Sequence, residues 1–172
     1  VAGKRMRAGV VSEDQLRRFR AERRILAGLS HPHVARLLDG GRGPDGRPYF
    51  AMELVEGEPL TGYADDRRLD VDARLALFVQ TCEAVAYAHR NLVVHRDLKP
   101  SNVLVTGGGE ERQVKLLDFG IARLLSDDAD ASLTRTGHRM MTPATAAPEQ
   151  VRGEPPSTAT DVYALGGLLY RL

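Results

Sequence analysis

The 172-residue sequence contains a single cysteine and carries almost no net charge. Cys82 alone cannot form an internal disulfide, and no Cys/His spacing typical of a metal site occurs, which favours a reducing compartment. The formal charge of +1 removes the long-range attraction that a strongly basic chain has for nucleic acid or for an anionic membrane. We therefore expect no nucleic-acid partner.

Long apolar runs and a signal-peptide pattern are missing too. The longest apolar stretch, residues 164–172, is short and contains Arg171. We expect a cytoplasmic domain with no membrane segment in this stretch of chain, and we leave open an anchor elsewhere in a longer protein.

Lysine is scarce as well. The sequence has 24 lysines and arginines, of which only Lys4, Lys99 and Lys115 are lysines. Lysine carries a compact point charge that the planar guanidinium of arginine does not replace. The three lysines are therefore candidates for positions where arginine will not serve.

With 42% hydrophobic and 27% charged residues, the sequence has enough apolar content to bury the core of one folded domain. The patterns predict strands over 1–6, 34–38, 49–55, 103–105 and 114–117, helices over 12–29 and 71–89, and a last helix from a Ser157 or Thr158 cap to Leu172. We expect a hairpin with a turn at 40–48, and an irregular stretch over 126–153. Gly57 and Pro59 break the pattern, so we place the boundary between a small and a larger lobe there.

One carboxylate stands out in the first predicted helix. At about 100° per residue, five apolar residues fall on one arc: Leu16, Phe19, Ile25, Leu26 and Leu29. Glu22 lies inside this arc rather than on the arginine-rich face. Because an apolar setting disfavours an unpaired carboxylate, Glu22 is a candidate for an ion pair; the alternative is an exposed place at the edge of the solvated face.

Four short motifs follow one another along the chain: V-A-G-K over 1–4, H-R-D-L-K-P-S-N over 95–102, D-F-G over 118–120 and A-P-E over 147–149. This ordered set resembles the signature of eukaryotic-type (Hanks-type) protein kinases, with bacterial Ser/Thr kinases as the nearest match. A lone D-F-G would often arise by chance, whereas the ordered set leaves little room for chance. The resemblance extends over essentially the whole chain.

The resemblance implies a partial, bilobal α+β protein-kinase-like fold, with a partial N-lobe and hinge over 1–55 and a partial C-lobe over 56–172. The glycine-rich loop of the family would precede Val1. The helices that normally follow the last one here are missing, together with the arginine that pairs with Glu149. We therefore expect a kinase domain truncated at both ends, and an isolated fragment that binds ATP weakly and is impaired in transfer.

The reaction that the resemblance implies is Mg²⁺-dependent transfer of the γ-phosphate of ATP to Ser/Thr hydroxyls of protein substrates. In this reading, Asp97 is the catalytic base and Lys99 neutralises the transferring phosphate. Asn102 and Asp118 hold Mg²⁺, which prefers hard oxygen ligands. A lysine two residues after the aspartate is typical of Ser/Thr rather than Tyr kinases. Taken alone, Asp97 would more often be a turn or cap residue.

The resemblance also implies a nucleotide site. Lys4 would hold the α- and β-phosphates and pair with Glu22; the bland alternative is a lysine on a frayed terminus. The residues around the base would be Met52 at the back of the pocket, Glu53, Leu54 and Val55 in the hinge, and Ala2 and Leu104 above and below. The apolar members of this set could equally belong to the plain core.

Further residues resemble parts of the family's regulation and packing. Arg96 is typical of kinases that phosphorylation of the activation segment switches on. Candidate autophosphorylation sites are Ser132, Thr134 and Thr136, each of which is as readily an ordinary loop hydroxyl. The remaining resemblances are Thr142, which would pack against Asp97 and Lys99, Asp161, which would brace the catalytic-loop backbone, and His95, which would pack in the core.

Two other functions stay open at this point. A pseudokinase-like binding module would keep the fold without transferring phosphate, although the intact Lys4, Asp97, Asn102 and Asp118 disfavour it. A small-molecule phosphotransferase of related fold typically has glycine in place of Arg96 and lacks D-F-G and A-P-E. A P-loop NTPase is excluded, because G-x-x-x-x-G-K-[ST] does not occur in the sequence.

Overall fold

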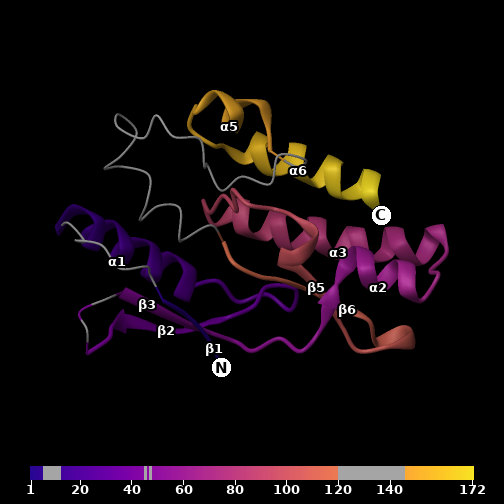
Figure 1. The fold of residues 1–172 in the computed structure, drawn as a ribbon, viewed down its shortest axis with the longest axis horizontal. Coiled ribbons are helices and arrows are strands. Elements are labelled where there is room, and N and C mark those ends of the chain that lie inside the picture. Colours follow the sequence, from indigo (N-terminus) through magenta and orange to yellow (C-terminus); the bar gives the residue numbers. More distant parts are fainter. Residues whose placement is uncertain (6–12, 45, 47, 120–145) are drawn as a thin grey trace.

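The computed structural model describes residues 1–5, 13–44, 46, 48–119 and 146–172 (Figure 1). Its helices are α1 (Glu13–Ala27), α2 (Leu60–Asp66), α3 (Val71–Arg90), α5 (Pro148–Arg152) and α6 (Thr158–Arg171), with short 3₁₀ turns η1 (Pro100–Asn102) and η2 (Gly109–Glu111). Its strands are β1 (Ala2–Arg5), β2 (Leu37–Arg42), β3 (Pro48–Met52), β4 (Glu58–Pro59), β5 (Val103–Thr106) and β6 (Gln113–Leu116).

The first three strands form an antiparallel sheet in the order β1-β3-β2, which confirms the predicted first strand and the pairing of the hairpin. The first arm of the hairpin lies over residues 37–42, so its predicted bounds of 34–38 are wrong. The predicted turn over 40–48 is too long, because Gly40 belongs to β2 and pairs with Phe50. A Cβ on Gly40 would lie 2.9 Å from Cδ of Arg23 and 3.1 Å from Cδ1 of Phe50. Glycine at this position therefore permits close packing inside a strand.

The last three strands form a second antiparallel sheet, and its β5–β6 hairpin confirms the two predicted strands. β4 was not predicted, since two residues give no periodic signal. Residues 53–57 connect the two sheets, and β3 ends at Met52 rather than at the predicted residue 55. A Cβ on Gly57 would lie 2.7 Å from the carbonyl oxygen of Val105. Only glycine fits this crossing, which lies where the boundary between the lobes was predicted.

Helices α3 and α6 begin at side-chain caps. Asp70 accepts a hydrogen bond from the N–H of Ala73 at 2.8 Å, and Ser157 accepts one from the N–H of Ala159 at 3.2 Å. Such caps satisfy backbone donors that the first turn of a helix leaves unpaired. The predicted helix over 71–89 and the predicted last helix are thus both confirmed.

The shorter helices and one helix face differ from the predictions. Neither α2 nor α5 was predicted, and α5 falls inside the stretch 126–153 that we expected to be irregular. A helix of five to seven residues is too short to establish a hydrophobic period. Leu26 in α1 and Leu29, two residues beyond its end, are buried as expected, but Ile25 is 48% exposed, so the predicted apolar arc is too broad.

Figure 1 shows the two parts of the molecule: α1 lies beside the β1-β3-β2 sheet, and α2, α3 and α6 lie with the second sheet. Residues 33–36 join them. Leu116 of β6 donates its N–H to the carbonyl of His33 at 2.8 Å and accepts from the N–H of Ala35 at 3.0 Å. One residue later, the carbonyl of Arg36 accepts from the N–H of Glu53 at 2.9 Å. Backbone hydrogen bonds thus fix one part against the other.

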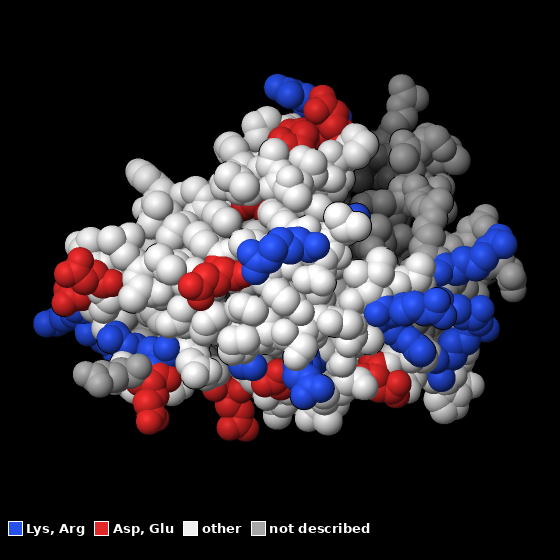
Figure 2. Space-filling model, turned by 180° about the vertical axis from the view of Figure 1, so that it is seen from behind, with Lys and Arg blue, Asp and Glu red and all other residues white. Residues whose placement is uncertain are grey.

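The charged surface is uneven. In Figure 2, Lys and Arg side chains gather at the end of the molecule that α1 occupies, and the exposed arginines of this helix are Arg17, Arg20, Arg23 and Arg24. This agrees with the arginine-rich face expected for the first helix. Within the described ranges, no helix has both the length and the apolar character that crossing a bilayer requires.

Candidate active site

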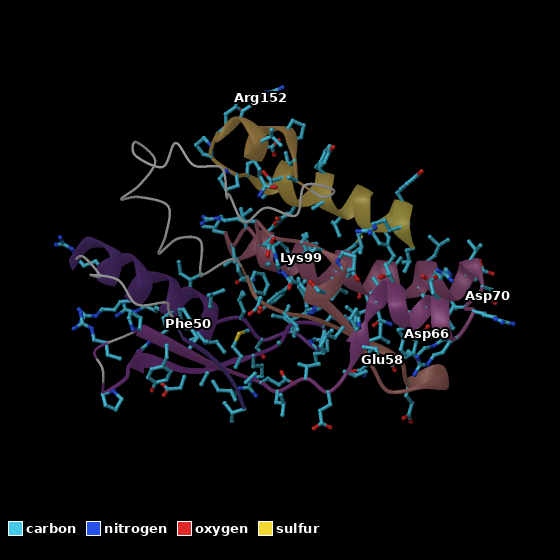
Figure 3. All side chains as sticks on the ribbon, in the orientation of Figure 1. Phe50, Glu58, Asp66, Asp70, Lys99 and Arg152 are labelled. Atoms are coloured by element: carbon cyan, nitrogen blue, oxygen red, sulfur yellow. The ribbon has the colours of Figure 1, made fainter. Side chains whose placement is uncertain are left out.

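The residues predicted to carry the chemistry lie together in the loop between α3 and β5. Nζ of Lys99 lies 2.9 Å from Oδ2 of Asp97. The side-chain amide of Asn102 donates to the backbone carbonyl of Asp97 at 2.8 Å and to its Oδ2 at 3.3 Å. In Figure 3, Lys99 lies near the middle of the molecule. Oδ2 of Asp97 therefore contacts both the ammonium group of Lys99 and the side-chain amide of Asn102.

A buried carboxylate from α6 holds the backbone of this loop. Asp161 is 1% exposed. Its Oδ2 accepts from the N–H of His95 at 2.7 Å and lies 2.8 Å from Nε2 of His89, and its Oδ1 accepts from the N–H of Arg96 at 2.8 Å. Burying a carboxylate is tolerated when it is hydrogen-bonded in this way. The prediction that Asp161 braces the loop is confirmed.

His95 uses both of its ring nitrogens inside the protein. Nε2 lies 2.8 Å from the carbonyl of Leu117, which can only accept, so Nε2 carries the proton. Nδ1 then accepts from the N–H of Asp97 at 3.3 Å. Burial lowers the pKa of His95, although the Leu117 carbonyl and nearby carboxylates act in the opposite direction. His95 is fully buried, with its ring 4.9 Å from that of Phe119, so it packs as predicted.

The residues expected to bind the metal lie on two adjoining segments. Leu117 donates its N–H to the carbonyl of Asn102 at 2.8 Å, so Asp118 directly follows a residue bonded to Asn102. Asp118 has a φ of 47°, and the next residue, Phe119, is buried. The side-chain nitrogen of Asn102 donates to Asp97, so the side-chain oxygen of the same amide points away from that contact. A carboxylate and an amide oxygen are a donor set that fits Mg²⁺.

The third lysine, Lys115, for which the sequence suggested no role, pairs with Glu53, the first residue of the expected hinge. Nζ of Lys115 lies 3.1 Å from Oε1 and 3.4 Å from Oε2 of Glu53. Oε2 also accepts from the N–H of Arg36 at 3.1 Å. Burial alone would raise the pKa of Glu53, but these two contacts hold it below its usual value. The scarcity of lysine was the one signal that could have singled out Lys115.

The proposed base pocket is only partly defined by contacts. Met52 is 8% exposed and lines an apolar pocket together with Leu26, Leu29, Val34, Ala35, Leu37 and Phe119. Ala2 pairs with Met52 in the first sheet, and Leu104 pairs with Pro59 and Lys115 in the second. Val55 is half-buried and Leu54 is 56% exposed. The residues expected above and below the base thus come from different sheets, and their roles stay predictions.

Several predicted residues lie outside what the structure describes. For Lys4, only its place in β1 opposite Phe50 is described, and for Glu22 only its place in α1, so their ion pair stays a prediction. Gly120, Thr142 and the three candidate phosphorylation sites lie in 120–145, outside the described residues.

α5 begins within the A-P-E motif, and its first turn makes hydrogen bonds that the sequence did not indicate. Oε1 of Glu149 accepts from the hydroxyl of Thr160 at 2.5 Å. This hydrogen bond lowers the pKa of Glu149. The side chain of Gln150 donates to the carbonyl of Arg96 at 2.8 Å and accepts from the N–H of Ala147 at 3.1 Å. α5 is therefore tied both to α6 and to the catalytic loop.

Comparison with known proteins places this geometry in context. A family model described as protein kinase domain matches residues 1–172. The serine/threonine-protein kinase PknA of Mycobacterium tuberculosis is 44% identical over 160 residues, covering 90% of this chain and 36% of that protein. The serine/threonine-protein kinase pkn2 of Myxococcus xanthus is 39% identical over 155 residues, covering 90% of this chain and 19% of that protein.

The fold is similar to that of a solved relative. The crystal structure of the Mycobacterium tuberculosis PknI kinase domain matches with a TM-score of 0.69 and 32% identity, covering 95% of this chain and 59% of that one. The similarity confirms the expected partial, two-lobed α+β architecture. The chain spans less than half the length of either curated relative named above.

Proposed function

The chain belongs to the protein kinase domain family, and from this premise we propose that it carries the catalytic machinery of a serine/threonine protein kinase. The substrates would be ATP and Ser/Thr hydroxyls of proteins. The observation that supports this most is the cluster in which Asp97 contacts both Lys99 and Asn102, on a loop whose backbone the buried Asp161 holds. Pseudokinase-like binding would need none of these contacts.

Asp97 would act on the acceptor hydroxyl. In the proposed reaction the hydroxyl oxygen bonds to the γ-phosphorus, the bond to the leaving ADP oxygen breaks, and the carboxylate of Asp97 takes the hydroxyl proton. The Asn102 amide and the Lys99 ammonium fix where Oδ2 of Asp97 lies. Lys99 is also placed to offset the negative charge of the transferring phosphate.

The remaining residues would bind the nucleotide and the metal. Asn102 and Asp118 would hold Mg²⁺, which when bound neutralises charge on the phosphates. The family uses ATP with Mg²⁺, and the oxygen donors of these two residues suit that ion. The backbone of the hinge would bind adenine, with Lys4 on the phosphates and Glu22 as its partner. The full set for the base is Ala2, Met52, Glu53, Val55 and Leu104.

Substrate class and regulation follow from the same premise. Lys99 and Thr142 favour Ser/Thr over Tyr acceptors, and the curated relatives carry the name serine/threonine-protein kinase. We assign the protein a cytoplasmic site of action and autophosphorylation at Ser132, Thr134 or Thr136. A phosphate there would bring negative charge to the segment that precedes α5.

The test is phosphate transfer from labelled Mg-ATP to a protein acceptor, by the longest natural form of the protein that contains this chain. D97N should lower kcat by at least about a hundredfold, because it removes the proton acceptor. D66N is the matched control: the same change on an exposed α2 residue that lies apart from Lys99 in Figure 3. Label on Ser or Thr that D97N abolishes supports the proposal. Equal transfer by wild type and D97N would overturn it.

A further inference from the structure

Arg96, the residue before Asp97, adopts an unfavourable backbone conformation. Arg96 has a φ of 68°, in the left-handed region that residues with a Cβ rarely enter. Such a conformation persists only where the surroundings hold it. Asp161 holds the N–H side of Arg96, at 2.8 Å. The orientation of the following residue, Asp97, then depends on what contacts the carbonyl oxygen of Arg96.

The carbonyl side is held by a side chain from another part of the chain. Nε2 of Gln150 donates to the carbonyl oxygen of Arg96 at 2.8 Å. This oxygen and the N–H of Asp97 belong to one planar peptide group, and that N–H donates to Nδ1 of His95 at 3.3 Å. The plane is therefore fixed at both of its polar atoms. Because the plane carries the Cα of Asp97, fixing it sets where the carboxylate starts.

The amide of Gln150 can adopt only one of its two orientations here. Its Oε1 accepts from the N–H of Ala147 at 3.1 Å, at the start of α5. Turning the amide over would place Oε1 against the Arg96 carbonyl and Nε2 against the Ala147 donor, which loses both hydrogen bonds. The same amide therefore bonds both to the start of α5 and to the backbone of the loop that carries Asp97, so the position of α5 affects the position of that loop.

From these contacts we propose that Gln150 is a positioning residue, which couples the placement of α5 to the orientation of Asp97. The proposal rests on the function proposed above. Gln150 acts through the Arg96–Asp97 peptide group and needs no contact with substrate or nucleotide. Its loss should therefore slow the chemical step and leave the binding of ATP nearly unchanged.

The sharpest variant is Q150E. It keeps the shape of the side chain and an acceptor for Ala147, but it puts a second oxygen against the carbonyl of Arg96. We expect kcat to fall about tenfold, as the loss of a partly buried hydrogen bond implies, with KM for ATP within about twofold of wild type. Q113E makes the same chemical change on an exposed β6 side chain and should leave both values unchanged. An unchanged kcat for Q150E, or an equal loss in both variants, would overturn the proposal.

Acid should partly rescue Q150E. A protonated carboxyl group regains an O–H donor for the Arg96 carbonyl, and the facing carbonyl oxygen disfavours the charged form, so the ratio of wild-type to Q150E kcat should shrink as the pH falls from about 7 toward about 5. A residue that only stabilised the fold would not produce this trend. A ratio that stays constant or grows on acidification contradicts the proposal.

Two further measurements remove the remaining ambiguities. Q150A deletes the donor without adding charge; it should also lower kcat selectively, and if neither variant folds, the amide maintains the fold and the proposal is wrong. Hydrogen exchange of the peptide covering 95–99 should be faster in Q150E than in Q113E, and equal exchange would contradict the proposal. Since exchange needs no turnover, it separates failure of this proposal from a wild-type protein that transfers nothing, which would overturn the proposed function instead.

Discussion

The catalytic loop and the hinge are held in different ways. The loop is fixed from inside, by a carboxylate of Asp161 that is 1% exposed and by the fully buried ring of His95. The hinge is fixed from outside, by an ion pair whose Lys115 and Glu53 side chains are 18% and 32% exposed. Buried hydrogen bonds tolerate little change, whereas partly exposed ion pairs are weaker and sensitive to salt. Under the proposed function, we expect the rigid loop to serve the chemical step and the adjustable hinge to serve nucleotide binding.

The largest expected effect comes from removing the internal brace. D161A leaves the N–H groups of His95 and Arg96 without their acceptor inside the protein. We expect a loss of about 3–5 kcal/mol in the free energy of unfolding, measured by urea denaturation, and a loss of transfer of at least about a hundredfold. D72A, an exposed change in the first turn of α3, is the control. A D161A protein as stable as wild type would show that the loop does not depend on this carboxylate.

The second effect concerns the cation of the loop. K99M keeps the length of the side chain but removes the charge 2.9 Å from Asp97. Because that charge would offset the transferring phosphate in the proposed reaction, kcat should fall about a hundredfold while KM for ATP changes little. Steady-state kinetics at varied ATP concentration measures both constants. A rise in KM with kcat unchanged would place Lys99 in binding instead of chemistry.

A smaller effect is expected in the hinge. K115M removes the ion pair with Glu53 and leaves only the Arg36 N–H on that carboxylate. KM for ATP should rise about two- to fivefold with kcat unchanged, because a partly exposed ion pair contributes up to about 1 kcal/mol. High salt should reduce the difference from wild type by screening the pair. A K115M effect that persists at high salt would contradict this origin.

The smallest effect is a pH dependence of stability. The pKa of Glu53 is lower in the folded protein than its ordinary value. Its contacts therefore stabilise the fold fully at pH values above the ordinary pKa. This stabilisation is lost as the pH falls through the lower pKa of the folded protein. Wild type should therefore lose more stability than E53Q between about pH 5 and pH 3 in urea titrations. E56Q, at an exposed neighbouring hinge residue, is the control. Parallel curves for wild type and E53Q would contradict the prediction.

The sequence predicted what depends on local pattern. The motif residues Asp97, Lys99 and Asn102 are close in the chain, so their spacing alone brings them together. The hairpins and the long helices have periodic apolar residues or side-chain caps, which also leave a local signal. The strong parts of the site prediction are those that need only a few consecutive residues.

What the sequence could not predict depends on distant contacts. Lys115 meets Glu53 across 62 residues, and Gln150 meets the Arg96 carbonyl across 54. Nothing in the sequence around Lys115 or Gln150 indicates which distant residue each of them contacts. α2 and α5 are too short for a period, and the tight approach of Gly57 to Val105 depends on how the two lobes join. Asp161 was found only because the family resemblance supplied its role.

The comparison of loop and hinge is tested most directly by one kinetic measurement: kcat and KM for ATP of wild type, K99M and K115M, assayed side by side at the same ionic strength. We predict that K99M changes kcat alone and K115M changes KM alone. If both variants change the same constant, the loop and the hinge do not divide chemistry from nucleotide binding, and the account is wrong.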